Sequence, residues 1–116
     1  MRELVELRDL TLSWSHDRGI LANGKLTTQG LKLVSEVGEL CDNIAKGANI
    51  EDDIGDCLVV LTNIAALYGT TLERCWEVAY EDIKDRKGFL NANGNFIKST
   101  DPKYKQLKME FDNATI

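Results

Sequence analysis

Two pairs of carboxylates with the same internal spacing lie on either side of a short polar break in this sequence. Glu36 and Glu39 form the first pair, and Asp53 and Asp56 form the second. A spacing of three residues puts both members of a pair on one face of an α-helix, about one turn apart. Four carboxylates brought together repel one another unless a cation lies between them. Oxygen ligands suit Mg²⁺ or Mn²⁺, so we expect a divalent metal site here.

The segments around these pairs predict an antiparallel helix hairpin. We expect one helix from an N-cap at Thr27 or Thr28 to about Lys46, and another over residues 50–68. Gly47, between them, is placed for a left-handed C-cap. The first pair lies eight to eleven residues before Gly47 and the second lies six to nine residues after it. At a rise of about 1.5 Å per residue, a hairpin therefore brings the two pairs side by side.

A row of solvated charges on a helix surface is the alternative interpretation of such a pair. That interpretation suits a single Glu-x-x-Glu well. Two aligned pairs favour the metal site, because four adjacent like charges would otherwise destabilise the hairpin or become partly protonated.

The remaining segments predict an all-α fold with a small β addition. Helices over residues 2–17 and 71–87 flank the hairpin and complete a bundle of four main helices, with a loop over residues 19–28. Two short β-prone runs around Asn93-Gly94 predict a C-terminal β-hairpin, and Asp101-Pro102 begins a short terminal helix. The chain of 116 residues is expected to form a single domain, residues 1–116.

Composition excludes several classes of function. The net charge is −5, which argues against a nucleic acid polymer or an anionic membrane as partner. No apolar run approaches the roughly 20 residues that span a bilayer, and the charged N-terminus does not resemble a signal peptide. We therefore expect a cytoplasmic protein. Cys41, Cys57 and Cys75 fit neither a disulfide framework nor a zinc site, and we expect them to be buried, reduced thiols.

Lys84, Arg86 and Lys87 form a tight basic cluster in the last turn of the expected fourth helix. One interpretation is simple capping of the helix dipole, and the other is binding of phosphate groups. Lys32, on the same helix stripe as Glu36 and Glu39, is a further candidate for phosphate binding. Trp14 is a candidate for stacking on a base, although its helical spacing from Leu7 and Leu10 favours a place in the core.

A resemblance to a known family is carried by these same segments. LKLVSEVGEL, a short gap, and IEDDIGDCLVVLTNIAALYG resemble the MazG family of all-α nucleotide pyrophosphohydrolases, whose signature is Glu-Glu-x-x-Glu on one helix and Glu-x-x-Asp on the next. Trp14, Gln29, IKDRKG and NGNFIK extend the similarity over most of residues 10–98. The short, single-domain members that phages often encode are the most similar.

The resemblance implies an enzyme that hydrolyses a nucleoside triphosphate between the α and β phosphates with Mg²⁺, giving a monophosphate and pyrophosphate. Glu36, Glu39, Asp53 and Asp56 match the metal-ligand positions. Either Glu36 or Glu39 would orient or deprotonate the attacking water. Family members of this kind are homodimers or homotetramers, and the apolar surface left by a helix hairpin also favours self-association.

The remaining candidate residues and the alternatives concern the substrate. Trp14, Gln29 and Asn63 are the candidates for contact with the base. Ser35 stands where the family usually has its first Glu, and Asp53 stands where it has the Glu of the second pair. Two alternatives therefore stay open: a related pyrophosphohydrolase acting on an alarmone or a phosphoribosyl nucleotide, and a nucleotide-binding or helical interaction module with reduced catalysis.

Overall fold

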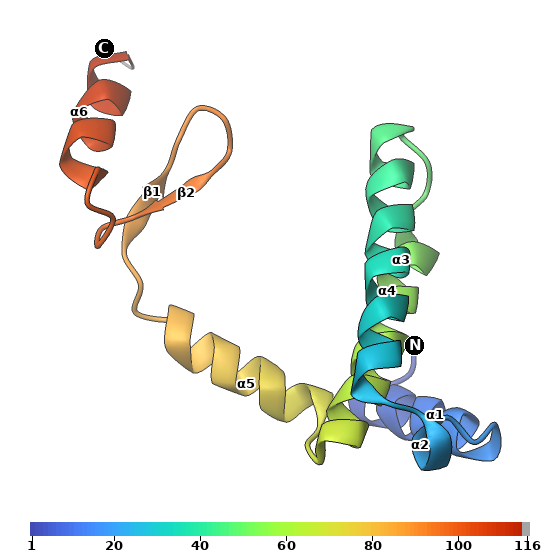
Figure 1. Ribbon diagram of the computed structural model, residues 1–116. Coiled ribbons are helices and arrows are strands. Elements are labelled where there is room, and N and C mark those ends of the chain that lie inside the picture. The colour runs from blue at the N-terminus through green and yellow to red at the C-terminus, as the bar shows by residue number, and fades with distance from the viewer. Residues whose placement is uncertain (115–116) are drawn as a thin grey trace. The chain divides into compact units, whose positions relative to one another are not determined.

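The computed structural model describes residues 1–114 as helices with one small sheet (Figure 1). The chain divides into two compact units, Met1–Trp76 and Glu77–Ile116. The elements are α1 (Leu4–Asp17), α2 (Ile20–Asn23), α3 (Leu26–Ala45), α4 (Glu51–Tyr68), α5 (Leu72–Ile83), β1 (Gly88–Leu90), β2 (Phe96–Lys98) and α6 (Tyr104–Ala114). The predicted all-α class, with four main helices, a small β-hairpin and a short terminal helix, is confirmed.

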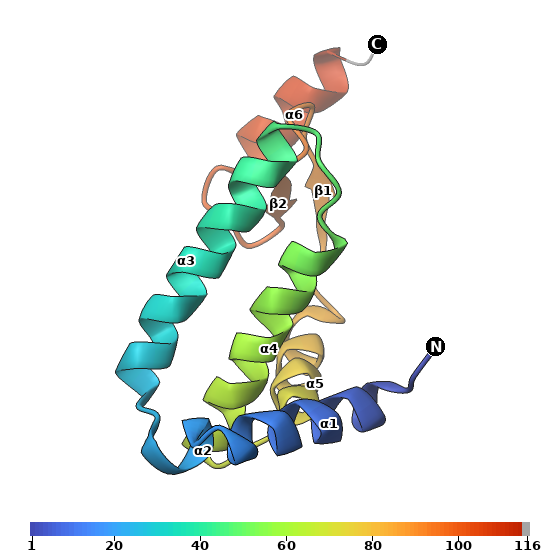
Figure 2. The ribbon, with the colours of Figure 1, turned by 90° about the vertical axis from the view of Figure 1, so that its right-hand side faces the viewer.

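The α3–α4 hairpin dominates the first unit, where the two helices run side by side in opposite directions (Figure 2). Gly47 ends α3 with a φ of 67°, the left-handed conformation that the sequence predicts. The Ala48 N–H donates to the Asn43 carbonyl at 3.0 Å, so that a carbonyl of the last turn keeps a partner. At the start of α4, Asn49 Oδ1 accepts from the Glu51 N–H at 2.9 Å. These caps fix a short turn and set the register of the two helices.

Helix α1 packs against α4 through a polar contact within a small core. Ser15 is fully buried, and its hydroxyl donates to Asn63 Oδ1 at 2.6 Å. Val60 and Ala65 of α4 are the buried apolar side chains among the described residues. The Thr62 hydroxyl donates back to the Leu58 carbonyl at 2.7 Å within α4. One buried hydrogen bond therefore fixes α1 on α4 in a unit with little apolar interior.

The second unit is built around an aromatic cluster. Strands β1 and β2 pair antiparallel around a turn in which Gly94 has a φ of 81°. The Phe89 ring lies 5.8 Å from that of Tyr104 and 5.1 Å from that of Phe111, measured between centroids. These contacts attach α6 to the hairpin. The sequence predicts that this helix begins at Asp101-Pro102, but α6 begins at Tyr104; Asp101 Oδ1 accepts from the Lys103 N–H at 2.8 Å in the turn that precedes the helix.

Two other expectations about helix ends were also wrong. Residues 19–28 are not a loop, because α2 lies within them and α3 already begins at Leu26; its N-cap is Lys25 instead of Thr27 or Thr28, without a side-chain cap. Helix α5 ends at Ile83, so the basic cluster follows the helix instead of forming its last turn. The polar threonines therefore led to a predicted start of α3 that is too late, and the basic residues led to a predicted end of α5 that is too late.

Burial of the cysteines was also predicted wrongly. Cys41 and Cys75 are exposed, and Cys57 is half-buried. The cause is the small core, because α3 and α4 bury mainly the residues between them and leave their outer faces uncovered. Among the described residues no single helix is long and apolar enough to cross a membrane, and α4 with α5 passes that test only as a bent pair.

Candidate metal centre on the helix hairpin

The hairpin brings members of both carboxylate pairs into partly buried positions between α3 and α4. Glu36 on α3 is 8% exposed, and Asp53 on α4 is 9% exposed. Lys32 Nζ lies 3.0 Å from Glu36 Oε1, one helical turn away on α3. Asn43 Nδ2 donates to Asp53 Oδ2 at 2.9 Å across the hairpin. The two buried carboxylates are therefore each held by a different kind of donor, an ammonium and an amide.

Electrostatics indicate that Glu36 of the first pair lies near the second pair. The pKa of Asp56 is raised, first by burial and then by the charges of Asp52, Glu36 and Asp53. The pKa of the Cys57 thiol is also raised, first by burial and then by Glu36, Asp56 and Asp53. An excess of negative charge therefore gathers where the hairpin aligns Glu36 with Asp53 and Asp56.

Lys32 is the cation that offsets this charge. Its pKa is raised first by the hydrogen bond to Glu36, then by attraction to Glu36, and further by Glu39 and Asp56. Over residues 1–114 no other Lys, Arg or His forms an ion pair with any of the four carboxylates. Glu39 itself is exposed and has no hydrogen bond or ion pair in the described part of the chain.

The donor chemistry fits a hard divalent ion, although the side chains are not arranged around one. Within residues 1–114 no three Asp, Glu, His or Cys side chains converge closely enough to hold a metal. The reason is visible in the contacts, since Glu36 is turned to Lys32 and Asp53 to Asn43. All four groups are carboxylates, the ligand type that Mg²⁺ prefers.

Comparison with known proteins identifies the family. The sequence model of the MazG nucleotide pyrophosphohydrolase domain matches residues 25–88, more than half of the chain. The chain belongs to the MazG nucleotide pyrophosphohydrolase family. The matched MazG segment contains all of α3, α4 and α5, and thus both carboxylate pairs.

A phage protein is also similar to part of this chain. An uncharacterized 18.2 kDa protein from the rep–hol intergenic region of Haemophilus phage HP1 is 37% identical over 67 residues, which are 56% of this chain and 41% of the phage protein. The chain thus spans less than half the length of this relative. No solved structure matches the chain. A short MazG member of phage type, as the sequence predicts, agrees with these findings.

The three candidate base contacts have different surroundings in the first unit. Gln29 is half-buried in the first turn of α3. Asn63 is 3% exposed, and its side-chain oxygen already accepts the Ser15 hydroxyl. Trp14 is 47% exposed, with the Arg18 guanidinium 4.3 Å from the ring centroid, so the expected core position was wrong. A cation stacked on an exposed indole covers one ring face without burying it.

The basic cluster lies in the second unit. Lys84 Nζ is 2.7 Å from Glu81 Oε2, and an Arg86 guanidinium nitrogen is 3.0 Å from Asp82 Oδ2. These acidic partners belong to the end of α5, so both cations are partly neutralised. Lys87 has no ion pair among residues 1–114. The cluster therefore keeps one unpaired ammonium for an anion.

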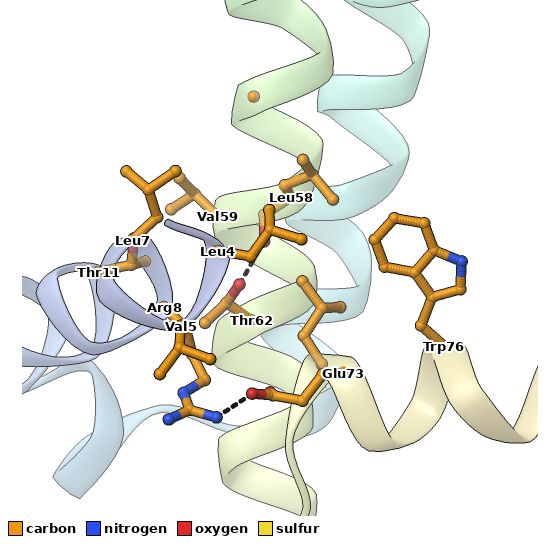
Figure 3. A pocket seen from close by; sticks show the side chains of 12 residues that line it. Leu4, Val5, Leu7, Arg8, Thr11, Leu58, Val59, Thr62, Glu73 and Trp76 are labelled. Atoms are coloured by element: carbon orange, nitrogen blue, oxygen red, sulfur yellow. Dashed lines mark hydrogen bonds and ion pairs between the residues drawn. The ribbon is translucent and has the colours of Figure 1, made fainter. Parts of the chain in front are cut away.

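Sequence reasoning missed an apolar groove in the first unit. The groove has a volume of about 410 Å³ and lies between α1, α4 and the start of α5 (Figure 3). Its walls are mostly apolar and include Leu4, Leu7, Leu58, Val59 and Trp76. At its edge Arg8 of α1 forms an ion pair with Glu73 of α5. None of the four carboxylates lines the groove, so the groove is separate from the candidate metal site.

The groove could be found in sequence only in part. The spacing of Leu4 and Leu7 predicts an apolar face on α1, and that of Leu58 and Leu61 predicts one on α4. Such a pattern marks which residues are apolar, while their coverage depends on how the helices pack. The structure shows that Leu4, Leu7 and Leu58 remain exposed.

Proposed function

We propose that this protein is a Mg²⁺-dependent nucleoside triphosphate pyrophosphohydrolase that converts an NTP or dNTP into the monophosphate and pyrophosphate. The observation that carries the proposal is the alignment of two carboxylate pairs across the α3–α4 hairpin, inside the segment that matches the MazG domain. We further propose that residues 1–116 act as one functional domain in the cytoplasm, where nucleotides and Mg²⁺ are available. Mn²⁺ would be an acceptable substitute.

The proposed ligands are Glu36, Glu39, Asp53 and Asp56. Mg²⁺, when bound, would neutralise charge on the triphosphate and make a nearby water molecule more acidic. Glu39 is exposed and unpaired, so it is free to accept a proton from that water. The water oxygen then bonds to the α phosphorus as the bond to the β-phosphate oxygen breaks, and pyrophosphate leaves.

Phosphate oxygens require cationic donors in such a reaction. We propose Lys32 for this role near the carboxylates, together with Lys84, Arg86 and Lys87 of the second unit. Trp14, Gln29 and Asn63 remain our candidates for contact with the base. Of these, Trp14 presents the most open surface, since nearly half of it is exposed.

The proposed reaction is tested by the products that are released. The protein is incubated with Mg²⁺ and a panel of canonical and modified nucleotides, with pyrophosphate and phosphate measured separately. Pyrophosphate release that stops on addition of a chelator supports the proposal. Phosphate release alone, or nucleotide binding without any turnover, would reject it in favour of another hydrolase or a binding module.

Substitution of Glu39 tests the role of the carboxylates directly. Glu39→Gln removes the proposed proton acceptor and a metal ligand while keeping the size of the side chain, so we expect turnover to fall at least about 100-fold. Circular dichroism checks that the fold is retained. Asp42→Asn is the matched control, because Asp42 is an exposed carboxylate on the same helix, outside the cluster. Unchanged turnover in Glu39→Gln would show that the stripe is only a charged surface.

We also propose that the chain self-associates. Val60 and Ala65 are the buried apolar residues, whereas many large apolar side chains of α1, α3 and α4 are exposed, among them Leu4, Leu10, Leu31, Val34 and Ile44. A chain of this length usually needs a larger core, or a partner, for stability. Exposed apolar surface of this extent is typical of a protein that is covered by a second copy.

A further inference from the structure

The ion pair between Lys32 and Glu36 is asymmetric in burial. The side chain of Lys32 is 58% exposed, while that of Glu36 is 10% exposed. The ammonium can therefore leave the contact by rotating into solvent, where it is well hydrated. Glu36 cannot turn into solvent in the same way, because little of its side chain is exposed. Any departure of Lys32 leaves a buried negative charge that requires another cation.

Lys32 acts on more than its direct partner. Its positive charge is attracted by Glu36, Glu39 and Asp56, three of the four clustered carboxylates. The fourth, Asp53, is held by the uncharged amide of Asn43. Lys32 is thus the positive charge of the cluster, paired with Glu36 on its own helix and also attracted by Asp56 on α4.

We propose that Lys32 is an internal counter-cation that a divalent metal ion displaces, and that the released ammonium then binds the phosphates of the nucleotide. This inference rests on the proposed function and concerns the regulation of the same site. The exchange makes the metal-free hairpin stable without an ion. It also makes binding of metal alone weaker, because the ion must replace an existing partner of Glu36. Phosphate gives the displaced ammonium a new partner, so metal and nucleotide each favour binding of the other.

Binding of Mn²⁺ without nucleotide separates this role from simple phosphate binding. Lys32→Met removes the competing charge and keeps the aliphatic stem, so we expect calorimetry to show Mn²⁺ binding about tenfold tighter than in the wild type. Lys32→Arg keeps a positive charge and is expected to retain the weak wild-type affinity. Lys46→Met is the matched control, since Lys46 is exposed at the end of the same helix and has no ion pair among the described residues.

Inorganic triphosphate then probes the second half of the exchange without any contribution from a base. In the presence of saturating Mn²⁺, we expect Lys32→Met to bind triphosphate about tenfold more weakly than the wild type. The substitution thus changes the two affinities in opposite directions. A purely structural role for Lys32 would weaken both or change neither, and either result would overturn the proposal, as would Mn²⁺ binding in Lys32→Arg as tight as in Lys32→Met.

Failure of the exchange is distinguishable from failure of the proposed reaction. If the wild type releases pyrophosphate and Lys32→Met binds Mn²⁺ no more tightly than the wild type, the exchange is wrong and the hydrolase stands. If Lys32→Met binds Mn²⁺ more tightly and no nucleotide is hydrolysed, the exchange stands and the hydrolase is wrong. Absence of Mn²⁺ binding in both proteins would overturn the exchange. Thermal unfolding of each variant confirms that comparisons are made between folded proteins.

Discussion

At the scale of single residues, Asp56 lies in surroundings that disfavour its charge. Its pKa is raised by burial and by neighbouring carboxylates, so the folded, metal-free protein binds this proton more tightly than the unfolded chain does. The free energy of unfolding therefore falls as pH rises from the ordinary carboxyl pKa through the raised one. Above both values, at neutral pH, the full penalty is present.

Removal of this charge should stabilise the metal-free protein. We expect Asp56→Asn to raise the melting temperature at pH 7 with a chelator present, by up to about 2 °C, since much of the interaction is screened by solvent. The gain should shrink as the pH is lowered through the raised pKa and should vanish below the ordinary Asp pKa of about 3.9, where Asp56 is protonated in both states. Differential scanning calorimetry at several pH values checks this, with Asp42→Asn as control. A gain that grows at low pH would contradict the sign of the shift.

Ser15 is the second residue whose surroundings lead to a clear expectation. Ser15→Ala would leave the buried oxygen of Asn63 without its donor, and we expect a loss of about 1–3 kcal/mol in the free energy of unfolding. Urea denaturation measures it. Ser13→Ala is the control on the same helix, because Ser13 is exposed and has no partner among the described residues. Equal effects of the two substitutions would mean that the contact with Asn63 contributes nothing.

At the scale of elements, the hairpin depends on a left-handed turn at Gly47. An alanine there would place a Cβ in a strained backbone with a φ of 67°, so we expect Gly47→Ala to cost about 1 kcal/mol. Gly38 lies inside α3, and a Cβ added there meets nothing within 4 Å. Gly38→Ala should therefore stabilise by about 0.5–1 kcal/mol through helix propensity. If Gly47→Ala and Gly38→Ala shift the urea midpoint in the same direction, the left-handed conformation at Gly47 does not control the stability of the hairpin.

The same hairpin shows what sequence alone could predict. Helical spacing and Gly47 were enough to predict α3, α4 and the turn between them, because those signals are local. The pairing of Lys32 with Glu36 also follows from a spacing of four residues on a helix. The contact of Asn43 with Asp53 depends on the register of the hairpin, and that of Ser15 with Asn63 depends on how α1 packs on α4. Such long-range contacts decide the burial of Trp14 and the cysteines, which local patterns misjudged.

At the scale of the whole molecule, the uncovered apolar surface predicts an assembly. We expect light scattering behind size exclusion to give at least twice the 13.0 kDa mass of one chain at micromolar concentration. Leu58 lines the groove, so Leu58→Asp should place a charge in a buried interface and yield the single chain. Leu31, exposed on α3 outside the groove, provides the comparison. Dissociation by Leu31→Asp and not by Leu58→Asp would move the interface from the groove to α3.

The placement of the two tryptophans gives this protein a built-in optical probe. Trp14 is half-exposed beneath the Arg18 guanidinium, whereas Trp76 is 61% exposed at the wall of the groove. Both indoles should therefore emit at the long wavelengths typical of solvated rings. Covering the groove would shift only the Trp76 emission to shorter wavelength, and a ligand that displaces Arg18 would affect only Trp14. The intrinsic fluorescence of single-tryptophan variants thus distinguishes events at the groove from events at the C-terminal end of α1 without any added label.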